Sequence, residues 1–285
     1  MPLNTPMSAD NPASETTGQT GNVSAIGKTS SSAEASLPTS ESSDAILGRL
    51  RENIARVYQR IEDARATYQA IQPVHLELAI KTQSAETCGL AAQALADPQF
   101  VSSHPILLGQ NRVQEAVASA EAVKATEGAS LHLIGPLQRN KINQALKVVD
   151  LVETVDSLKL AEALNQRVVG GPLPIFLQVN VSGETAKSGV APAEFFRLAE
   201  AVLALENLKI AGLMTVAGRG TEAEVRPQFA TMQALRDELA QRFDLGRQKP
   251  LELSMGMSGD MEWAIAEGAT IVRAGTAIFG PRATR

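Results

Sequence analysis

Short apolar runs and longer amphipathic stretches alternate along the chain from residue 43 onward. The first stretch, SDAILGRLRENIARVYQRIEDARATYQAI, has apolar residues at the three- and four-residue spacing of a helix, with Ser43 or Asp44 as its cap. The eight apolar runs that follow are typical of strands. They span residues 75–81, 105–109, 131–135, 150–154, 174–181, 208–216, 250–256 and 269–274. Further helical patterns span residues 84–97, 112–125, 140–148, 157–168, 192–206, 222–243 and 260–267.

Strict alternation of strand and helix predicts a parallel sheet, because parallel strands need a crossover connection between them. Eight strand–helix units within residues 43–285 match the size of a single (β/α)8 TIM barrel of the α/β class. A doubly wound open sheet is the alternative. No Gly-x-Gly-x-x-Gly motif follows the first strand, which weakens a dinucleotide-binding interpretation.

Residues 1–42 differ in composition from the rest of the chain. They are rich in Ser, Thr, Ala, Asn and Gly and nearly lack aromatic and branched apolar residues. Such a segment buries too little surface to offset the entropy of ordering it. We therefore predict a disordered low-complexity tail, followed by one domain over residues 43–285. The tail lacks the apolar segment of a secretory signal.

The composition argues against several classes of protein. The 285 residues carry a net charge of -5 with a pI near 5.4, whereas a nucleic-acid-binding domain normally has a basic face. No apolar run reaches the roughly 18 residues of a membrane-spanning helix. The single cysteine, Cys88, excludes an intrachain disulfide and suits a reducing cytoplasm. With three histidines and one cysteine, we expect no His/Cys metal cluster.

One strand ends in a lysine that a barrel could use chemically. The run LELAIKTQ (76–83) alternates, so that Lys81 lies at the strand end on the face opposite the large apolar residues. In a (β/α)8 barrel, active-site residues lie at the carboxyl ends of strands. A solvated lysine is the ordinary interpretation of Lys81, and a nucleophile is the other.

Two late segments predict a phosphate site near this lysine. The loops after strands 7 and 8 often bind phosphate in this fold, and SMGMSGD (254–260) and AGT (274–276) supply glycines and hydroxyls there. Arg273 alternates with its neighbours so that it points where Lys81 points, and strand 8 adjoins strand 1 in a closed barrel. A lysine beside cationic groups is deprotonated more easily and can form a Schiff base. The ligand is then a sugar phosphate, as in lysine aldolases, or pyridoxal 5'-phosphate (PLP).

The chain resembles the YggS/PROSC family of PLP homeostasis proteins, whose barrel is similar to the N-terminal domain of alanine racemase (PLP fold type III). The resemblance runs from about residue 50 to residue 282 and rests on the order and spacing of several motifs. These are AIKTQ (79–83), HLIGPLQRNK (132–141), VDSLKLAEALN (155–165), QVNVSGETAKSG (178–189), GLMTV (212–216) and LSMGMSGDMEWAIAEGATIVRAGTAIFG (253–280).

The resemblance implies a set of cofactor-binding residues on one rim of the barrel. Lys81 would hold PLP as a Schiff base and Arg273 would face the pyridine nitrogen, where a cation disfavours protonation and makes the ring a weaker electron sink. The residues implied at the phosphate are Ser254, Gly275 and Thr276. The residues implied on or near the same rim are Ser258, Asn111, His132 and Met214.

Three of these residues also have structural interpretations, which the sequence leaves open. Asn111 can cap the helix predicted over 112–125, and Ser258 can cap the helix that begins near Asp260. His132 can be a hydrogen-bonded core histidine.

The chain also departs from the family pattern. LGQNRVQEA (108–116) stands where the family has FGENY, so Gln110 and Arg112 differ while Asn111 is kept. The stretch 94–105 is longer than the family implies and is predicted to be an enlarged loop.

The resemblance implies a PLP holder in vitamin B6 homeostasis more than a catalyst. A fold-type III racemase needs a second base, typically a tyrosine of a separate domain, but Tyr58 and Tyr68 both lie in the first predicted helix, and we expect no second domain after residue 282. We therefore expect a monomeric, non-catalytic carrier or buffer of PLP, with apo forms of PLP enzymes as acceptors and with neither nucleic acid nor membrane as partner. A fold-type III enzyme such as an amino-acid racemase and a PLP-free Schiff-base aldolase are the alternatives.

Overall fold

The strands form a closed parallel barrel in the order in which they occur in the chain. The computed structural model describes residues 41–101, 104–247 and 249–281, and these contain all eight predicted strands. Strand β1 pairs with β2 on one side and with β8 on the other, which closes the sheet. The predicted (β/α)8 fold is therefore confirmed. The strands are β1 (His75–Ala79), β2 (Ile106–Gln110), β3 (Ala129–Leu133), β4 (Leu151–Val155), β5 (Leu173–Gln178), β6 (Leu208–Met214), β7 (Glu252–Met257) and β8 (Ile271–Ala274).

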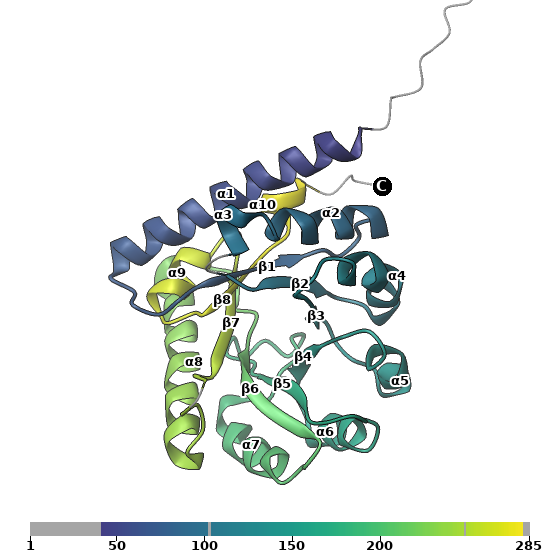
Figure 1. Ribbon diagram of the computed structural model, residues 1–285. Helices are drawn as coiled ribbons and strands as arrows, with labels where there is room; N and C mark the ends of the chain where they lie inside the picture. The colour runs from purple at the N-terminus through teal and green to yellow at the C-terminus, as the bar shows by residue number, and fades with distance from the viewer. Residues whose placement is uncertain (1–40, 102–103, 248, 282–285) are drawn as a thin grey trace, which may run out of the picture. The chain divides into compact units, whose positions relative to one another are not determined.

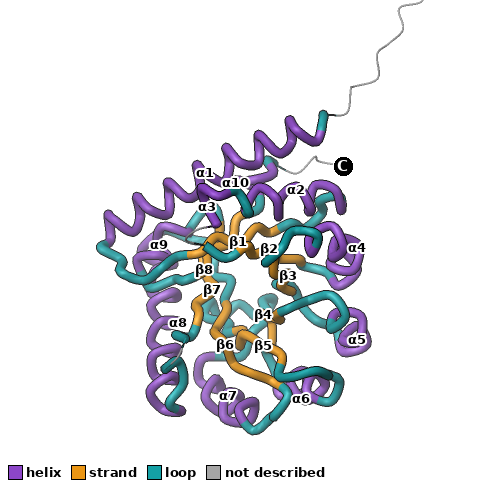
Figure 2. Tube along the Cα trace, viewed as in Figure 1, coloured by secondary structure: helices purple, strands orange, loops and turns teal. Residues whose placement is uncertain are grey.

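Helices surround the barrel, as the ribbon and the coloured trace both show (Figures 1 and 2). The longest, α1 (Ser43–Tyr68) and α8 (Glu222–Phe243), lie before β1 and before β7. Among the described residues, no helix is long and apolar enough to cross a membrane. The shorter helices are α2 (Ala85–Leu95), α3 (Pro98–Val101), α4 (Val113–Lys124), η1 (Arg139–Lys141), α5 (Ile142–Ala145), α6 (Leu158–Asn165), η2 (Pro192–Glu194), α7 (Phe195–Leu203), α9 (Met261–Ala266) and α10 (Thr276–Phe279).

The sequence pattern missed two short helices and one cap. Helix α3 lies in the stretch 94–105 that was predicted to be a loop, and α10 follows strand β8 directly. Each has four residues, too few to show a helical period. Helix α1 is capped one residue before the predicted cap, because the Ser42 side chain accepts a hydrogen bond from the Ala45 amide. Most of the predicted tail, residues 1–40, lies outside the described residues.

Each strand separates two apolar layers. Along β1, Leu76 and Leu78 are fully buried in the main core, which lies between the sheet and the helices. The alternate residue Glu77 is also fully buried but points into the barrel. The barrel interior is filled by a second cluster of large side chains, which is the packed interior typical of this fold. That cluster consists of Leu107, Leu151, Phe176, Met214 and Ile271.

Helix α1 packs across the outside of the barrel near the place where it closes. Its apolar face, including Leu50, Ile54 and Ile61, is buried in the main core. Figure 1 shows the helix lying over α2, α9 and α10, which come from opposite ends of the folded chain. Burying one such side chain stabilises the fold by about 1.5–3 kcal/mol. The apolar face of α1 therefore packs against helices from the beginning and from the end of the folded chain.

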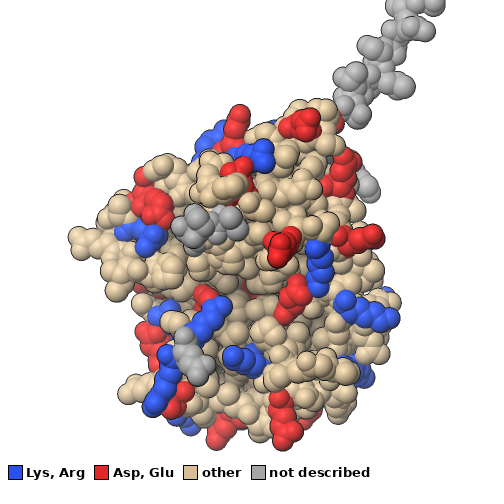
Figure 3. Space-filling view, in the orientation of Figure 1, with Lys and Arg blue, Asp and Glu red and all other residues tan. Residues whose placement is uncertain are grey.

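Charges of both signs are interspersed on the face that Figure 3 draws, and no basic area dominates it.

Candidate functional site

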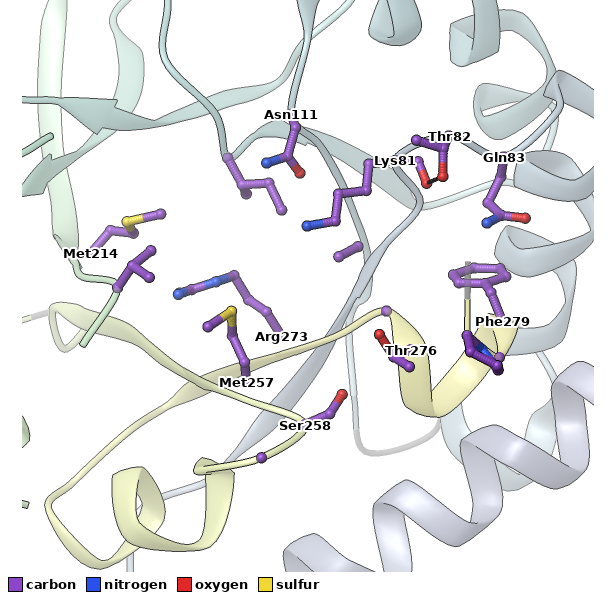
Figure 4. Close-up of a pocket in the computed structure, with 17 residues that line it drawn as sticks. Lys81, Thr82, Gln83, Asn111, Met214, Met257, Ser258, Arg273, Thr276 and Phe279 are labelled. Atoms are coloured by element: carbon purple, nitrogen blue, oxygen red, sulfur yellow. Dashed lines mark hydrogen bonds between the residues drawn. The ribbon is translucent and has the colours of Figure 1, made fainter. Parts of the chain in front are cut away.

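A cavity of about 510 Å³ opens at the carboxyl ends of the barrel strands (Figure 4). Strands β1 and β8 and the loops after β1, β2 and β7 supply most of its wall. Seven of the nine residues predicted for the cofactor line it, and His132 and Ser254 do not. The seven are Lys81, Asn111, Met214, Ser258, Arg273, Gly275 and Thr276.

Lys81 extends into this cavity from the turn after β1, and Figure 4 draws its amine between Asn111 and Arg273. The turn continues through Thr82, which adopts a left-handed backbone conformation with φ of 65°. A β-branched residue is strained there, and functional sites often retain such strain. The hydroxyl of Thr82 donates to the Lys81 carbonyl at 2.6 Å, and its amide donates to Glu115 at 3.4 Å. These contacts hold the main chain that carries the lysine.

Asn111 lies beside Lys81 in Figure 4 and does not cap the following helix. Helix α4 begins at Val113, and its N-cap residue Arg112 makes no side-chain capping bond. The Oδ1 atom of Asn111 is buried and has no hydrogen-bond partner among the described residues. Position 135 must be glycine for this arrangement, because an added Cβ would lie 2.1 Å from the Asn111 carbonyl oxygen. Asn111 therefore offers a ligand an unused polar atom.

Two turns form the opposite end of the cavity. Figure 4 shows the hydroxyls of Ser258 and Thr276, one from the turn after β7 and one from the start of α10, on the same side of the cavity. Ser258 is not a helix cap, since Asp260 occupies the N-cap position of α9. A Cβ added at Gly259 would meet no atom within 4 Å, so this turn leaves room for a ligand. The two turns thus present hydroxyls and open backbone at one end of the cavity.

Arg273 lies on the cavity floor and is 4% exposed. Its Nη1 donates to the Ser254 hydroxyl at 2.7 Å, and its Nη2 donates to the Thr215 carbonyl at 2.7 Å. The Ser254 hydroxyl in turn donates to Glu153 at 2.6 Å. Ser254, which was expected at the phosphate, therefore lies below the cavity and holds Arg273.

His132 also lies below the cavity, between two buried carboxylates. Its Nδ1 is 2.9 Å from an oxygen of Glu153 and 3.0 Å from an oxygen of Glu77, and its Nε2 is 3.1 Å from the Ser130 hydroxyl. Burial alone would lower the pKa of His132, but the hydrogen bond to Glu153 and the negative charges of Glu77 and Glu153 outweigh it and raise this pKa to about 10. The imidazole is therefore a buried cation, which matches the core interpretation of this histidine.

The two carboxylates differ in their titration. Burial, together with the charge of Glu153, raises the pKa of Glu77 to about 7 despite the neighbouring His132. Burial also acts to raise the pKa of Glu153, but His132, Arg273 and Ser254 outweigh burial and lower it. One ligand atom from each of Glu77, His132 and Glu153 lies within 4.8 Å of the others, a spacing that a metal ion could bridge. The proton on His132 already places a cation between the carboxylates.

Several cavity residues were absent from the sequence prediction. Thr82 and Gln83 follow Lys81, Met257 precedes Ser258, and Phe279 belongs to the unpredicted helix α10. The buried group beneath the cavity was partly visible in the sequence. Glu153 is the charged residue in the buried run LVETV, at a position that alternates inward. A charged side chain inside a buried strand signals a partner in the barrel interior.

Comparison with known proteins identifies relatives over nearly the whole described chain. Residues 46–283 match the family described as alanine racemase, N-terminal domain. The pyridoxal phosphate homeostasis protein of Pseudomonas aeruginosa is 41% identical over 240 residues, which cover 83% of this chain and 97% of that protein.

Solved structures of similar sequence have the same fold. A crystal structure described as that of an unknown protein from Bifidobacterium adolescentis is 38% identical with a TM-score of 0.74, over 83% of this chain and 96% of that one. PipY of Synechococcus elongatus, whose structure has PLP bound, is 34% identical with a TM-score of 0.61, over 77% of this chain and 100% of that one.

Proposed function

Because this chain belongs to the family of pyridoxal phosphate homeostasis proteins, we propose that it binds PLP in the cavity at the barrel mouth. The observation that carries the proposal is the convergence of three kinds of group on one cavity. These are the amine of Lys81, the guanidinium of Arg273 and the hydroxyls of Ser258 and Thr276. PLP combines an aldehyde with an anionic phosphate, and these groups complement both.

The residues present fit this cofactor in size and in hydrogen bonding. A cavity of about 510 Å³ is within the range of small-ligand sites. The buried Oδ1 of Asn111 still needs a partner, which a polar group on the ring would supply. Gly259 leaves the backbone of the first turn open to the phosphate, and Gly275 lines the cavity at the second.

We propose further that Lys81 holds PLP as a Schiff base. Lys81 would hold the cofactor through its amine, and PLP would supply the aldehyde that condenses with an amine and releases its oxygen as water. The reaction is a condensation and requires no oxidant or reductant. The Thr82 turn supports this role because it holds the main chain directly after the lysine.

The residues of the cavity also favour a protein that holds PLP over an enzyme that uses it in catalysis. When bound, PLP supplies an electron sink, and the cation of Arg273 weakens that sink by disfavouring protonation of the ring nitrogen. A racemase needs a proton-transfer group besides the lysine. Among the described residues that line the cavity, none is Asp, Glu, His, Cys or Tyr. Tyr58 is buried on α1, and Tyr68 lies at the end of the same helix.

The physiological role that follows is storage and delivery of PLP. The relatives are named for homeostasis of this cofactor, and a site without a second base suits a protein that binds PLP and releases it unchanged. We propose apo forms of PLP enzymes as acceptors, a monomeric state, and a reducing cytoplasm as the compartment, since the one cysteine, Cys88, is buried and unpaired by any disulfide.

The decisive experiment is a visible spectrum of the purified protein, followed by borohydride reduction and peptide mass mapping. We expect a yellow protein that bleaches on reduction, with the pyridoxyl group on Lys81. Lys81→Ala should lose the visible band, whereas Lys141→Ala, which changes another lysine near the barrel mouth, should keep it. A colourless protein that takes up no added PLP would contradict the proposal. Trapping by reductant only after a sugar phosphate is added would indicate an aldolase.

A further inference from the structure

The two turns at the hydroxyl end of the cavity are both bonded to helix α1. The first turn follows β7 and contains Ser258, and the second follows β8 and continues into α10 with Thr276. Both turns lie near the end of the described chain, whereas α1 is its first element. The first described helix therefore contacts the part of the site that the chain forms last.

Arg60 binds the first turn through its backbone. The Nη2 of Arg60 donates to the Ser258 carbonyl at 2.9 Å, and its Nε donates to Glu262 at 2.8 Å in the first turn of α9. The Ser258 carbonyl belongs to the residue whose hydroxyl lines the cavity. A charged donor makes a stronger hydrogen bond than a neutral one, so Arg60 fixes this main chain firmly.

Asn53 binds helix α10, which follows the second turn directly. Its Nδ2 donates to the Ile278 carbonyl at 2.7 Å, and the Ile278 side chain is fully buried. Asn53 and Arg60 are seven residues apart, which is about two helical turns, so both lie on one face of α1. One rigid helix therefore sets the position of both turns.

We infer that Asn53 and Arg60 are positioning residues for the phosphate of the bound cofactor and that they set how long PLP is retained. This inference rests on the proposed PLP binding. No described residue of α1 lines the cavity, so both side chains act through the backbone of the turns. Holding the turns in place before the ligand arrives lowers the cost of ordering them on binding. If either hydrogen bond is removed, the hydroxyls of Ser258 and Thr276 are no longer held at a fixed position relative to each other.

PLP and pyridoxal should respond differently to the loss of these hydrogen bonds, because pyridoxal lacks the phosphate. Both ligands carry the aldehyde that meets Lys81 and the ring nitrogen that meets Arg273, but only PLP uses the two turns. Loosening the turns should therefore weaken PLP and leave pyridoxal unchanged. A general loss of folding would weaken both ligands alike, so the ratio of the two affinities separates positioning from structural damage.

The test measures the dissociation constants and dissociation rates of PLP and pyridoxal, using full-length apo protein and the visible band. For Arg60→Ala and Asn53→Ala we expect PLP dissociation to become about tenfold faster and pyridoxal affinity to stay within about twofold. Arg60→Lys should restore part of the PLP affinity, since a lysine can still donate to the Ser258 carbonyl. The matched control is Arg56→Ala, one turn earlier on α1, whose side chain contacts Glu52 of its own helix.

The possible results distinguish a failure of the positioning role from a failure of PLP binding itself. If the unchanged protein binds neither ligand, PLP binding itself is wrong. If it binds PLP and the two variants retain PLP as it does, or lose both ligands equally, the positioning role is overturned. Melting temperatures check folding, and Asn53→Ala, which removes no charge, decides the matter if Arg60→Ala does not fold.

Discussion

The Ser254 hydroxyl lies 2.7 Å from Nη1 of Arg273 and accepts a hydrogen bond from it. The same hydroxyl donates to Glu153, so the buried carboxylate acts on the cavity floor through a single oxygen atom. A guanidinium held by two acceptors has one orientation, and Ser254 supplies one of the two. The sequence pattern alone would have assigned this serine to a phosphate.

Replacing this serine should affect the arginine more than the fold. We expect Ser254→Ala to lower the free energy of unfolding by about 1.5–3 kcal/mol, because a hydrogen bond to a charged group is lost. With Arg273 freer to move, protonation of the bound ring should become easier, so the visible band should acquire a pH dependence. Spectra recorded from pH 6 to 9 measure this effect. Ser130→Ala is the matched control, since Ser130 contacts His132 and not Arg273. Identical pH profiles for the two variants would contradict the role of Ser254.

Glu77 predicts a specific dependence of stability on pH. Its pKa is raised in the folded protein from 4.5 to about 7, so between these values the folded state binds more protons than the unfolded state. The contribution of Glu77 is therefore fully present below about pH 4.5 and is lost as the pH rises through 7. Relative to the unchanged protein, Glu77→Gln should become more stable as the pH rises from 5 to 7. Urea unfolding at several pH values measures this difference, and a difference that is constant with pH would contradict it.

His132 adds a second loss of stability at higher pH. Its folded pKa of about 10 lies above the unfolded value of 6.5, so its stabilisation is complete below about pH 6.5. That stabilisation is lost as the pH rises through 10. We expect the melting temperature to fall between pH 7 and 10 by more in the unchanged protein than in His132→Gln. Equal slopes for the two proteins would show that the imidazole is not a buried cation.

Gly135 is predicted to control the position of Asn111. In Gly135→Ala the new Cβ would lie 2.1 Å from the Asn111 carbonyl oxygen, so the backbone must shift. Overpacking of this kind costs about 1–3 kcal/mol, and PLP affinity should fall with it. Gly48→Ala is the control, because a Cβ at Gly48 meets nothing within 4 Å and replaces a mid-helix glycine. That change should stabilise α1 by about 0.5–1 kcal/mol. Unfolding curves and PLP titrations of both variants test the comparison.

The absence of a second base in the described cavity wall predicts no racemase activity. L-alanine and other amino acids incubated with the PLP-loaded protein should keep their configuration, as chiral chromatography would show. The assay should span a wide range of protein concentrations. Turnover that depends on Lys81 and rises steeply with protein concentration would indicate a base supplied by a second copy, and would favour the enzyme alternative.

The alternation of strands and helices determined the barrel from the sequence alone. Apolar periods of two and of 3.6 residues identify strands and helices locally, and all eight strands were placed within a few residues. The period also fixed which face each residue occupies, so Lys81 and Arg273 were correctly expected on the same inner rim. Helices α3 and α10 escaped because four residues show no period.

The tertiary structure alone decided the depth of each inward residue. A period of two assigns Ser254 to the inner face, but its height along the barrel depends on how the tilted strands are staggered. The register of β7 against β8 shifts between Ser254 and Met257, which leaves Ser254 below the cavity and Ser258 on its wall. The same holds for the contacts of α1, since Arg60 and Ser258 are 198 positions apart and meet only when the barrel closes. A local pattern determines face and element, whereas depth and long-range partners arise from packing the whole chain.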